Sequence, residues 1–212
     1  MKQYIKWVTL LGMFLVLACS REQGPLIVDD SGVTKDHLAD VRTGDTLDYQ
    51  YGAASFDTSF NHNGQEIEIH LTRQLSEDST RVFQTLLRDG DPVHARCFEN
   101  RIDLELLHSS ESPFTQQIRK RDLLPAIRPW LDEAHAQFFL EQAILVNVRF
   151  QKSEGSGGYL FTSSFQISGT LLPDLISLRV YPDCCTTLVP RKQAARLIHE
   201  RFEQSRQVHA TP

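Results

Sequence analysis

Residues 62–73 have the sequence HNGQEIEIHLTR, and this stretch gives the clearest indication of the fold. Asn63-Gly64 is a dipeptide that readily supplies the positive φ angles of a type I′ turn. After the turn every second residue is apolar: Ile67, Ile69 and Leu71. Such alternation is typical of a strand buried on one face. We therefore predict a β-hairpin whose arms contain residues 58–60 and 65–73.

Similar patterns recur along the rest of the chain. We predict further strands at residues 81–87, 93–98, 101–107, 114–118, 143–151, 159–168 and 174–181. A turn at residues 89–92, DGDP, and a Gly- and Ser-rich loop at residues 153–158 separate neighbouring strands. These features predict a mainly β, antiparallel fold, either a lipocalin-like barrel or a strongly curved sheet.

Two segments depart from the strand pattern. Pro125 and Pro129 exclude one uninterrupted helix over residues 121–140, so we expect a broken helical segment there. Near the end of the chain, residues 190–207 place Ala194, Ile198 and Phe202 four residues apart. That spacing predicts an amphipathic C-terminal helix that docks on the sheet.

The first residues have the features of a secretory leader. Lys2 and Lys6 precede an apolar run at residues 8–17, which is shorter than the roughly 20 residues that span a membrane. The run ends in Val16-Leu17-Ala18-Cys19, which resembles the lipobox of bacterial lipoproteins. The resemblance implies a signal peptide at residues 1–18, acylation of Cys19 with palmitate-type chains, and anchoring in the cell envelope at the outer membrane. The alternatives are an ordinary secretory signal with an incidental cysteine and a short N-terminal anchor.

The mature chain divides into a polar start and a patterned remainder. Residues 19–55 lack a sustained apolar period, so we expect a lipidated flexible tether there; residues 56–212 are expected to form one β-rich domain with a C-terminal helical extension.

Removing residues 1–18 takes away two of the 22 basic residues and none of the 27 acidic ones, which changes the formal charge from −5 to −7. This charge disfavours nucleic acid as a partner.

With Cys19 acylated, the mature chain keeps an odd number of cysteines: Cys97, Cys184 and Cys185. In an oxidising compartment, Cys97 is a candidate for a disulfide with one of the two adjacent cysteines. A vicinal disulfide between Cys184 and Cys185 and a set of reduced, partly buried thiols are the alternatives.

Four segments together suggest a family: Asp57-Thr58, Asn63-Gly64-Gln65-Glu66, residues 99–103 and residues 114–120. In this order they resemble the Bacteroidetes-type lipoproteins of domain of unknown function 4738, over about residues 56–182. Residues 161–167 and the strand that ends at Tyr181-Pro182 also fit that pattern. The resemblance implies an antiparallel barrel or curved sheet and supplies no activity. Glu99 stands where the family has Asp, and residues 184–212 extend beyond its usual end.

Short motifs that suggest catalysis lack their required context. Residues 132–135, DEAH, have no upstream phosphate-binding loop, and His199-Glu200 is followed by Glu203 where a zinc helix needs a second histidine. The Gly-rich run at residues 155–158 precedes no helix, and a Gly-x-Ser-x-Gly elbow is absent from the sequence. We treat four other histidines as dispersed and solvent-facing: His62, His70, His94 and His108. We therefore expect no catalytic residue, cofactor or metal site.

The function expected from these observations is that of a membrane-anchored, non-enzymatic module. It would bind a small apolar ligand or an envelope protein. A structural or assembly lipoprotein with a filled barrel is the first alternative, because the alternating strand residues are bulky. An envelope hydrolase is the second alternative.

Overall fold

The computed structural model describes residues 24–42, 44–62, 64–77, 81–108, 112–155, 157–181 and 185–210. Among these, 56% are in strands and 24% are helical. The elements in chain order are β1 (Leu26–Val28), α2 (Lys35–Ala39), β2 (Thr46–Tyr51), β3 (Ala54–His62), β4 (Gln65–Leu75), β5 (Arg81–Arg88), β6 (Asp91–Phe98), β7 (Asn100–His108), β8 (Phe114–Arg119), α3 (Lys120–Leu123), η1 (Leu124–Ala126), η2 (Arg128–Trp130), α4 (Glu133–Gln142), β9 (Ala143–Ser153), β10 (Tyr159–Ile167), β11 (Thr170–Tyr181), β12 (Cys185–Val189) and α5 (Lys192–Ala210).

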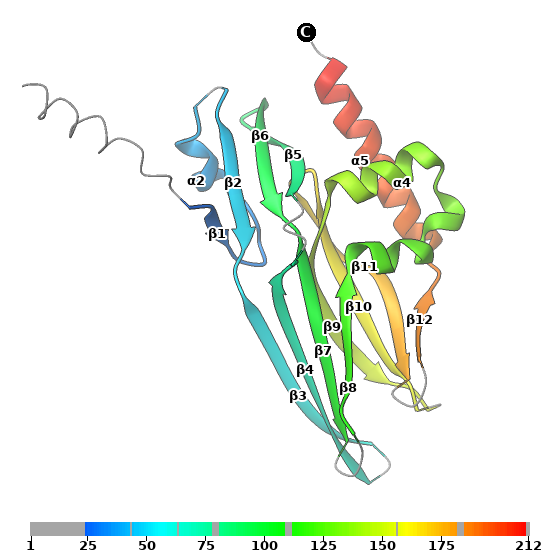
Figure 1. The fold of residues 1–212 in the computed structure, drawn as a ribbon. Coiled ribbons are helices and arrows are strands. Elements are labelled where there is room, and N and C mark those ends of the chain that lie inside the picture. Colours follow the sequence, from blue (N-terminus) through cyan, green and yellow to red (C-terminus); the bar gives the residue numbers. More distant parts are fainter. Residues whose placement is uncertain are drawn as a thin grey trace, which may run out of the picture.

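The described strands form three four-stranded sheets (Figure 1). The N-terminal sheet has the order β1-β2-β6-β5, the central sheet β3-β4-β7-β8, and the C-terminal sheet β12-β11-β10-β9. The predicted mainly β fold is confirmed. Within the described residues the strands do not close into a lipocalin-like barrel, because each sheet ends in edge strands and the sheets meet through side chains.

The hairpin predicted from residues 62–73 is confirmed as β3 and β4. Gly64 has a φ of +84°, and its N–H donates to Asn61 Oδ1 over 2.9 Å. Ile67, Ile69 and Leu71 are buried, as their alternation predicts. The strands predicted between residues 81 and 168 are confirmed as β5 to β10.

The N-terminal sheet contains parallel pairs, which the sequence did not predict. β3 and β7 both run antiparallel to β4, so they share one direction. β4 ends at Leu75, and beyond that point β2 and β6, which lead into β3 and β7, pair directly. The two chain segments that lie on either side of β4 run in the same direction, so beyond its end they pair in parallel as β2 and β6.

The segment expected to be a tether contributes two strands to this sheet, β1 and β2. β1 and β2 place four hydrophobic side chains in a second core together with α2: Val28, Leu38, Tyr49 and Tyr51. Tyr49 is also tied to the C-terminal sheet, because Gln166 Nε2 donates to its hydroxyl over 3.3 Å. Residues 26–42 and 44–51 are therefore part of the fold and not a tether. Residues 19–23, including Cys19, lie outside the described residues.

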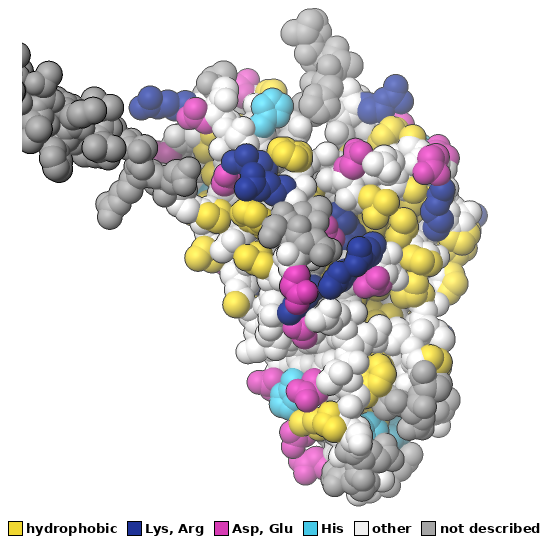
Figure 2. All heavy atoms as spheres, in the orientation of Figure 1, with side chains coloured by type: hydrophobic (Ala, Val, Ile, Leu, Met, Phe, Trp, Pro, Cys, Tyr) yellow, Lys and Arg dark blue, Asp and Glu magenta, His cyan; other side chains and the backbone are white. Residues whose placement is uncertain are grey.

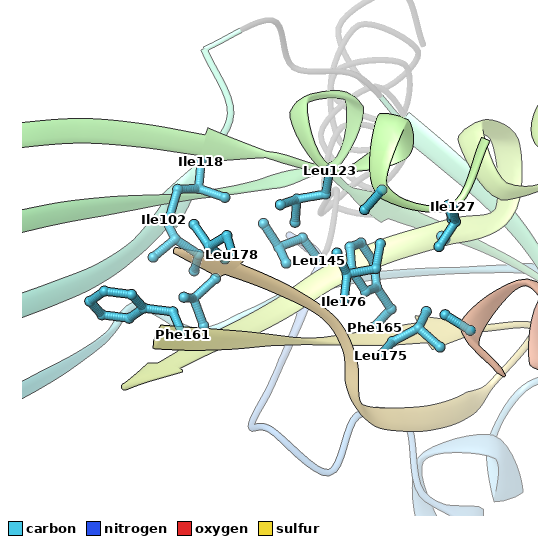
Figure 3. Close-up of a cluster of buried hydrophobic side chains, with 14 of the residues drawn as sticks. Ile102, Ile118, Leu123, Ile127, Leu145, Phe161, Phe165, Leu175, Ile176 and Leu178 are labelled. Atoms are coloured by element: carbon cyan, nitrogen blue, oxygen red, sulfur yellow. The ribbon is translucent and has the colours of Figure 1, made fainter. Parts of the chain in front are cut away.

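The main core lies between the central and C-terminal sheets and under the helices. Figure 3 shows Ile102 and Ile118 of the central sheet facing Phe161 and Leu178 of the C-terminal sheet. Burial of each such side chain contributes about 1.5–3 kcal/mol before entropy costs. Large side chains from both sheets therefore occupy the space in which a barrel would hold a ligand.

The helical cap, which we define as α3, η1, η2, α4 and α5, covers one end of this core (Figure 1). Pro125 and Pro129 lie in the two short 3₁₀ turns, so the predicted broken helical segment is confirmed. The predicted C-terminal helix is α5, which packs on α4 through Phe138 and Phe202, with ring centroids 5.3 Å apart. None of the helices in the described part of the chain is long and apolar enough to cross a bilayer.

A buried lysine joins the cap to the sheets. Lys120 Nζ donates to the carbonyl oxygens of Leu140 at 2.6 Å and Ala143 at 2.8 Å, and lies 3.5 Å from Glu99 Oε2. Burial lowers the pKa of Lys120, and the Glu99 carboxylate opposes that effect. The ammonium group thus satisfies carbonyls at the end of α4, where the chain turns into β9.

The end of the β region differs from the prediction. β11 begins at Thr170, four residues before the predicted start, after a tight turn in which Ser168 and Gly169 have φ angles of +45° and +77°. β12 was not predicted, because its CTTLV sequence lacks the alternation of a half-buried strand.

Candidate functional site

A groove of about 860 Å³ lies between η2, α4 and α5. Its lining is mainly apolar, with cationic, imidazole, carboxylate and amide groups interspersed: Trp130, Leu131, Asp132, His135, Lys192, Gln193, Ala195, Arg196 and His199. Figure 2 shows hydrophobic and charged side chains gathered together over the helical cap. A concave, largely apolar surface with a few polar groups is typical of a small-molecule site.

Asp132 organises one end of the groove. It is the N-cap of α4, and its Oδ1 accepts from the backbone N–H of His135 over 2.8 Å. The same oxygen lies 2.6 Å from His135 Nδ1. Both hydrogen bonds lower the pKa of Asp132, so its carboxylate is ionised at neutral pH and favours a proton on Nδ1 of His135.

His199 approaches His135 from α5. Its Nδ1 lies 2.6 Å from His135 Nε2, and the ring centroids are 4.5 Å apart. Because Asp132 holds the proton on His135 Nδ1, the Nε2 lone pair faces His199. Ala195 and Ile198 beside His199 are buried in the core and fix the helix face that carries it.

Glu203 completes a three-residue group that we call the histidine–glutamate cluster: His135, His199 and Glu203. One ligand-type atom from each residue lies within 4.8 Å of the other two. His199 and Glu203 are four residues apart and so share a face of α5. Two imidazoles and a carboxylate are ligands that transition metals accept.

The sequence contained both halves of this cluster but no sign that they meet. DEAH at residues 132–135 and the His199-Glu200 motif were set aside separately, because each lacked its usual context. The second histidine that the α5 motif lacked is His135, which α4 places beside His199. The signals available were the Asp132-to-His135 spacing of a helix cap and the His199-to-Glu203 spacing of one helical turn.

Of the four histidines treated as dispersed, His70 and His94 lie on different sheets, whereas His62 and His108 approach the same tyrosine. His70 Nδ1 is 2.7 Å from Asp57 Oδ1 on the central sheet, and this hydrogen bond raises the pKa of His70. The rings of His62 and His108 both approach Tyr159, with centroids 6.3 and 6.1 Å from it. His94 lies on the N-terminal sheet, on the wall of a separate hollow that includes Phe83.

The cysteine predictions have different outcomes. Cys97 carries a free thiol buried in the second core, and burial raises its pKa to about 12. The predicted disulfide from Cys97 is therefore not formed; the thiol is neutral and packs as a small apolar group. Cys185 is exposed at the start of β12, while Cys19 and Cys184 lie outside the described residues. Lipidation of Cys19 and the vicinal pair remain predictions.

No family model matches the chain, and no curated protein is significantly similar to it. The resemblance to domain of unknown function 4738 remains a prediction, and the functional argument depends on the geometry of the groove.

Proposed function

We propose that the protein is a lipid-anchored, non-enzymatic binding module of the cell envelope that holds a small amphipathic anion in the groove of the helical cap. The single observation that carries this proposal is the groove itself. Its volume of about 860 Å³ lies within the usual range for small-molecule sites, roughly 300–1,000 Å³. The described core is occupied by large side chains, so the cap offers the better place for a ligand.

The apolar part of the ligand is matched by Trp130, Leu131 and Ala195. Trp130 lines the groove and is 41% exposed. An exposed indole beside an apolar wall is a common anchor for ring- or chain-shaped ligands, because it offers a large apolar area and one N–H donor.

The charged part of the ligand is matched by Lys192 and Arg196. These two residues are four apart on α5 and both line the groove. Arg196 Nε lies 3.5 Å from Glu200, but both side chains are largely exposed, so this ion pair is weak and leaves Arg196 available. The expected ligand therefore has an apolar body and a carboxylate or similar anionic group.

Binding can be followed by tryptophan fluorescence. The chain has two tryptophans, Trp7 and Trp130, and removal of the proposed signal peptide leaves Trp130 as the only tryptophan. We expect phenylbutanoate, an aromatic ring with a carboxylate, to shift Trp130 emission saturably when added to the mature lipidated protein in lipid nanodiscs. As a control, the same probe is added to nanodiscs without protein, which measures how much of it partitions into the lipid.

A double charge reversal, Lys192→Glu with Arg196→Glu, should weaken this binding at least about tenfold, the equivalent of roughly 1.4 kcal/mol. Arg201→Glu on the same helix, outside the groove lining, is the matched control and should leave binding unchanged. A linear, unsaturable response, or equal affinity in the double variant and the control, would refute the groove as the ligand site.

Membrane anchoring has its own test. We expect the mature N-terminal peptide to begin at Cys19 and to carry the mass of acyl chains, since several chains together hold a protein stably on a membrane. Cys19→Ala should prevent processing and acylation. An unmodified mature N-terminus in a soluble envelope fraction would refute anchoring without affecting the groove.

A further inference from the structure

We propose that His135, His199 and Glu203 form a binding site for a divalent transition metal ion of the zinc type, at the end of the groove where α4 and α5 pack together. The inference goes beyond ligand binding in the groove and does not depend on it. It is carried by the arrangement of three side chains and of one carboxylate behind them.

The distances suit a metal after a small adjustment. His135 Nε2 and His199 Nδ1 lie 2.6 Å apart, and the ligand atoms of all three residues are within 4.8 Å of one another. Zinc–nitrogen bonds of about 2.0–2.1 Å in a tetrahedral site place two ligand nitrogens about 3.3 Å apart. The two imidazoles therefore need to separate by less than about 1 Å. His199 is exposed and Glu203 is half-buried, so both side chains have room to rotate while buried His135 stays in place.

The tautomer of His135 is the one that a metal requires. Asp132 Oδ1 accepts from Nδ1 over 2.6 Å, which leaves the Nε2 lone pair directed at His199. In the metal-free state this lone pair accepts the proton of His199 Nδ1. A bound ion takes the place of that proton, which His199 then carries on its other ring nitrogen. A carboxylate behind a ligating histidine is the usual outer partner in zinc sites, where it fixes the ring and strengthens the ligand.

Packing holds His135 and the backbone of both helices in place. The ring of His135 packs on Phe202, with centroids 4.4 Å apart, and Phe202 in turn packs on Phe138 of α4. Ile198 lies fully buried on the same helix as His199 and Glu203. Ligands on two packed helices are positioned more precisely than ligands on loops.

The ligand set also indicates which ion fits. Two imidazole nitrogens favour zinc, copper or nickel, whereas calcium and magnesium prefer oxygen ligands alone. Three protein ligands leave one position of a tetrahedral ion open for water or for an anionic group of a second ligand.

Cobalt absorption tests the site directly. Co²⁺ is titrated into the full mature protein after chelator treatment, and its visible d–d bands report the geometry. We expect saturation at one ion per chain and displacement by Zn²⁺. A sulfur-to-cobalt charge-transfer band in the near ultraviolet would assign the ion to cysteine and overturn the proposal.

Matched substitutions identify the ligands. His199→Gln, at an exposed position, and Glu203→Gln should each weaken Co²⁺ binding by more than the roughly 10–100-fold that loss of an outer partner costs. His94→Gln and Glu200→Gln are the controls, an exposed histidine elsewhere and the glutamate one turn from Arg196. Far-ultraviolet circular dichroism of each variant establishes that the fold is retained. Absence of saturable binding, or equal affinity in His199→Gln and His94→Gln, would overturn the proposal.

Asp132→Asn isolates the outer partner. Asparagine caps a helix about as well as aspartate, so α4 is retained while the charge behind His135 is lost. Cobalt affinity should fall about 10–100-fold. Unchanged affinity in this variant and in both cluster variants would show that His135 and His199 share a structural hydrogen bond only.

Discussion

His70 and His135 each have a carboxylate at hydrogen-bond distance, and they differ in what lies on the other side of the ring. His70 Nδ1 lies 2.7 Å from Asp57 and its Nε2 lies 3.5 Å from Glu68, so both ring nitrogens face carboxylates. His135 has Asp132 at 2.6 Å on one side and His199 at 2.6 Å on the other. The first arrangement raises the pKa of His70, whereas the second places His135 between a carboxylate and a second imidazole.

Burial separates the two sites further. The carboxylates are equally exposed, at 64% for Asp57 and 65% for Asp132, but the side chain of His70 is 34% exposed and that of His135 only 11%. The comparison teaches that the same two residue types can play different parts. On the sheet, aspartate and histidine form a surface ion pair, whereas between the helices the aspartate supports a histidine that is a candidate metal ligand.

The largest effect should come from removing the support under the helical cap. Ile198→Ala deletes a fully buried side chain and should lower the free energy of unfolding by about 2–5 kcal/mol, because a cavity remains. Since α5 carries His199 and Glu203, Co²⁺ binding should weaken as well, while the titration of His70 stays unchanged.

Urea unfolding and cobalt titration measure both parts of this prediction. Leu87→Ala, at a side chain that is 54% exposed, is the control and should change stability by less than about 0.5 kcal/mol. A loss below about 1 kcal/mol in Ile198→Ala would mean that α5 is not anchored by the main core.

The difference between the His70 and His135 sites also shows which features can be predicted from the sequence alone. Alternation and the Asn63-Gly64 turn predicted the hairpin of the central sheet, because both signals are local. The same alternation placed His70 and Glu68 on the outer face, and the register of β3 and β4 then sets Asp57 opposite His70. A surface pair within one hairpin is thus close to predictable.

The features that the sequence did not predict depend on contacts between distant segments. β2 and β6 pair in parallel only because β4 ends at Leu75 between them, which no local pattern reveals. His135 and His199 are 64 residues apart and meet through the packing of α4 on α5. Leu47, Tyr49 and Tyr51 do alternate in the segment expected to be a tether, so its strand had a detectable signal.

A smaller effect on the free energy of unfolding should distinguish Asp132 from Asp57. Asp132→Ala removes the N-cap of α4 and should cost about 0.5–2 kcal/mol of stability. Asp57→Ala removes one partner of an exposed pair and should cost less than about 1 kcal/mol. Urea denaturation of both variants, with Asp132→Asn as the cap-preserving control, checks the order. Equal losses for Asp57→Ala and Asp132→Ala would contradict the assignment of Asp132 as a helix cap.

The smallest effect concerns the pH dependence of the sheet pair. Because the hydrogen bond from Asp57 raises the pKa of His70 in the folded state, the pair stabilises the protein fully below the unfolded-state pKa, about 6.5. This contribution is lost as the pH rises through the higher folded-state pKa. Solvent and salt screen an exposed pair, so it should not exceed about 1 kcal/mol.

Nuclear magnetic resonance titration of the His70 ring measures this pKa directly. Asp57→Asn should return it toward the ordinary histidine value, and high salt should do so partly in the unsubstituted protein. The stability difference between the two proteins should be greatest near pH 5.5 and should shrink at pH values above about 8. A difference that grows with pH would show that Asp57 and His70 do not stabilise the protein as an ion pair.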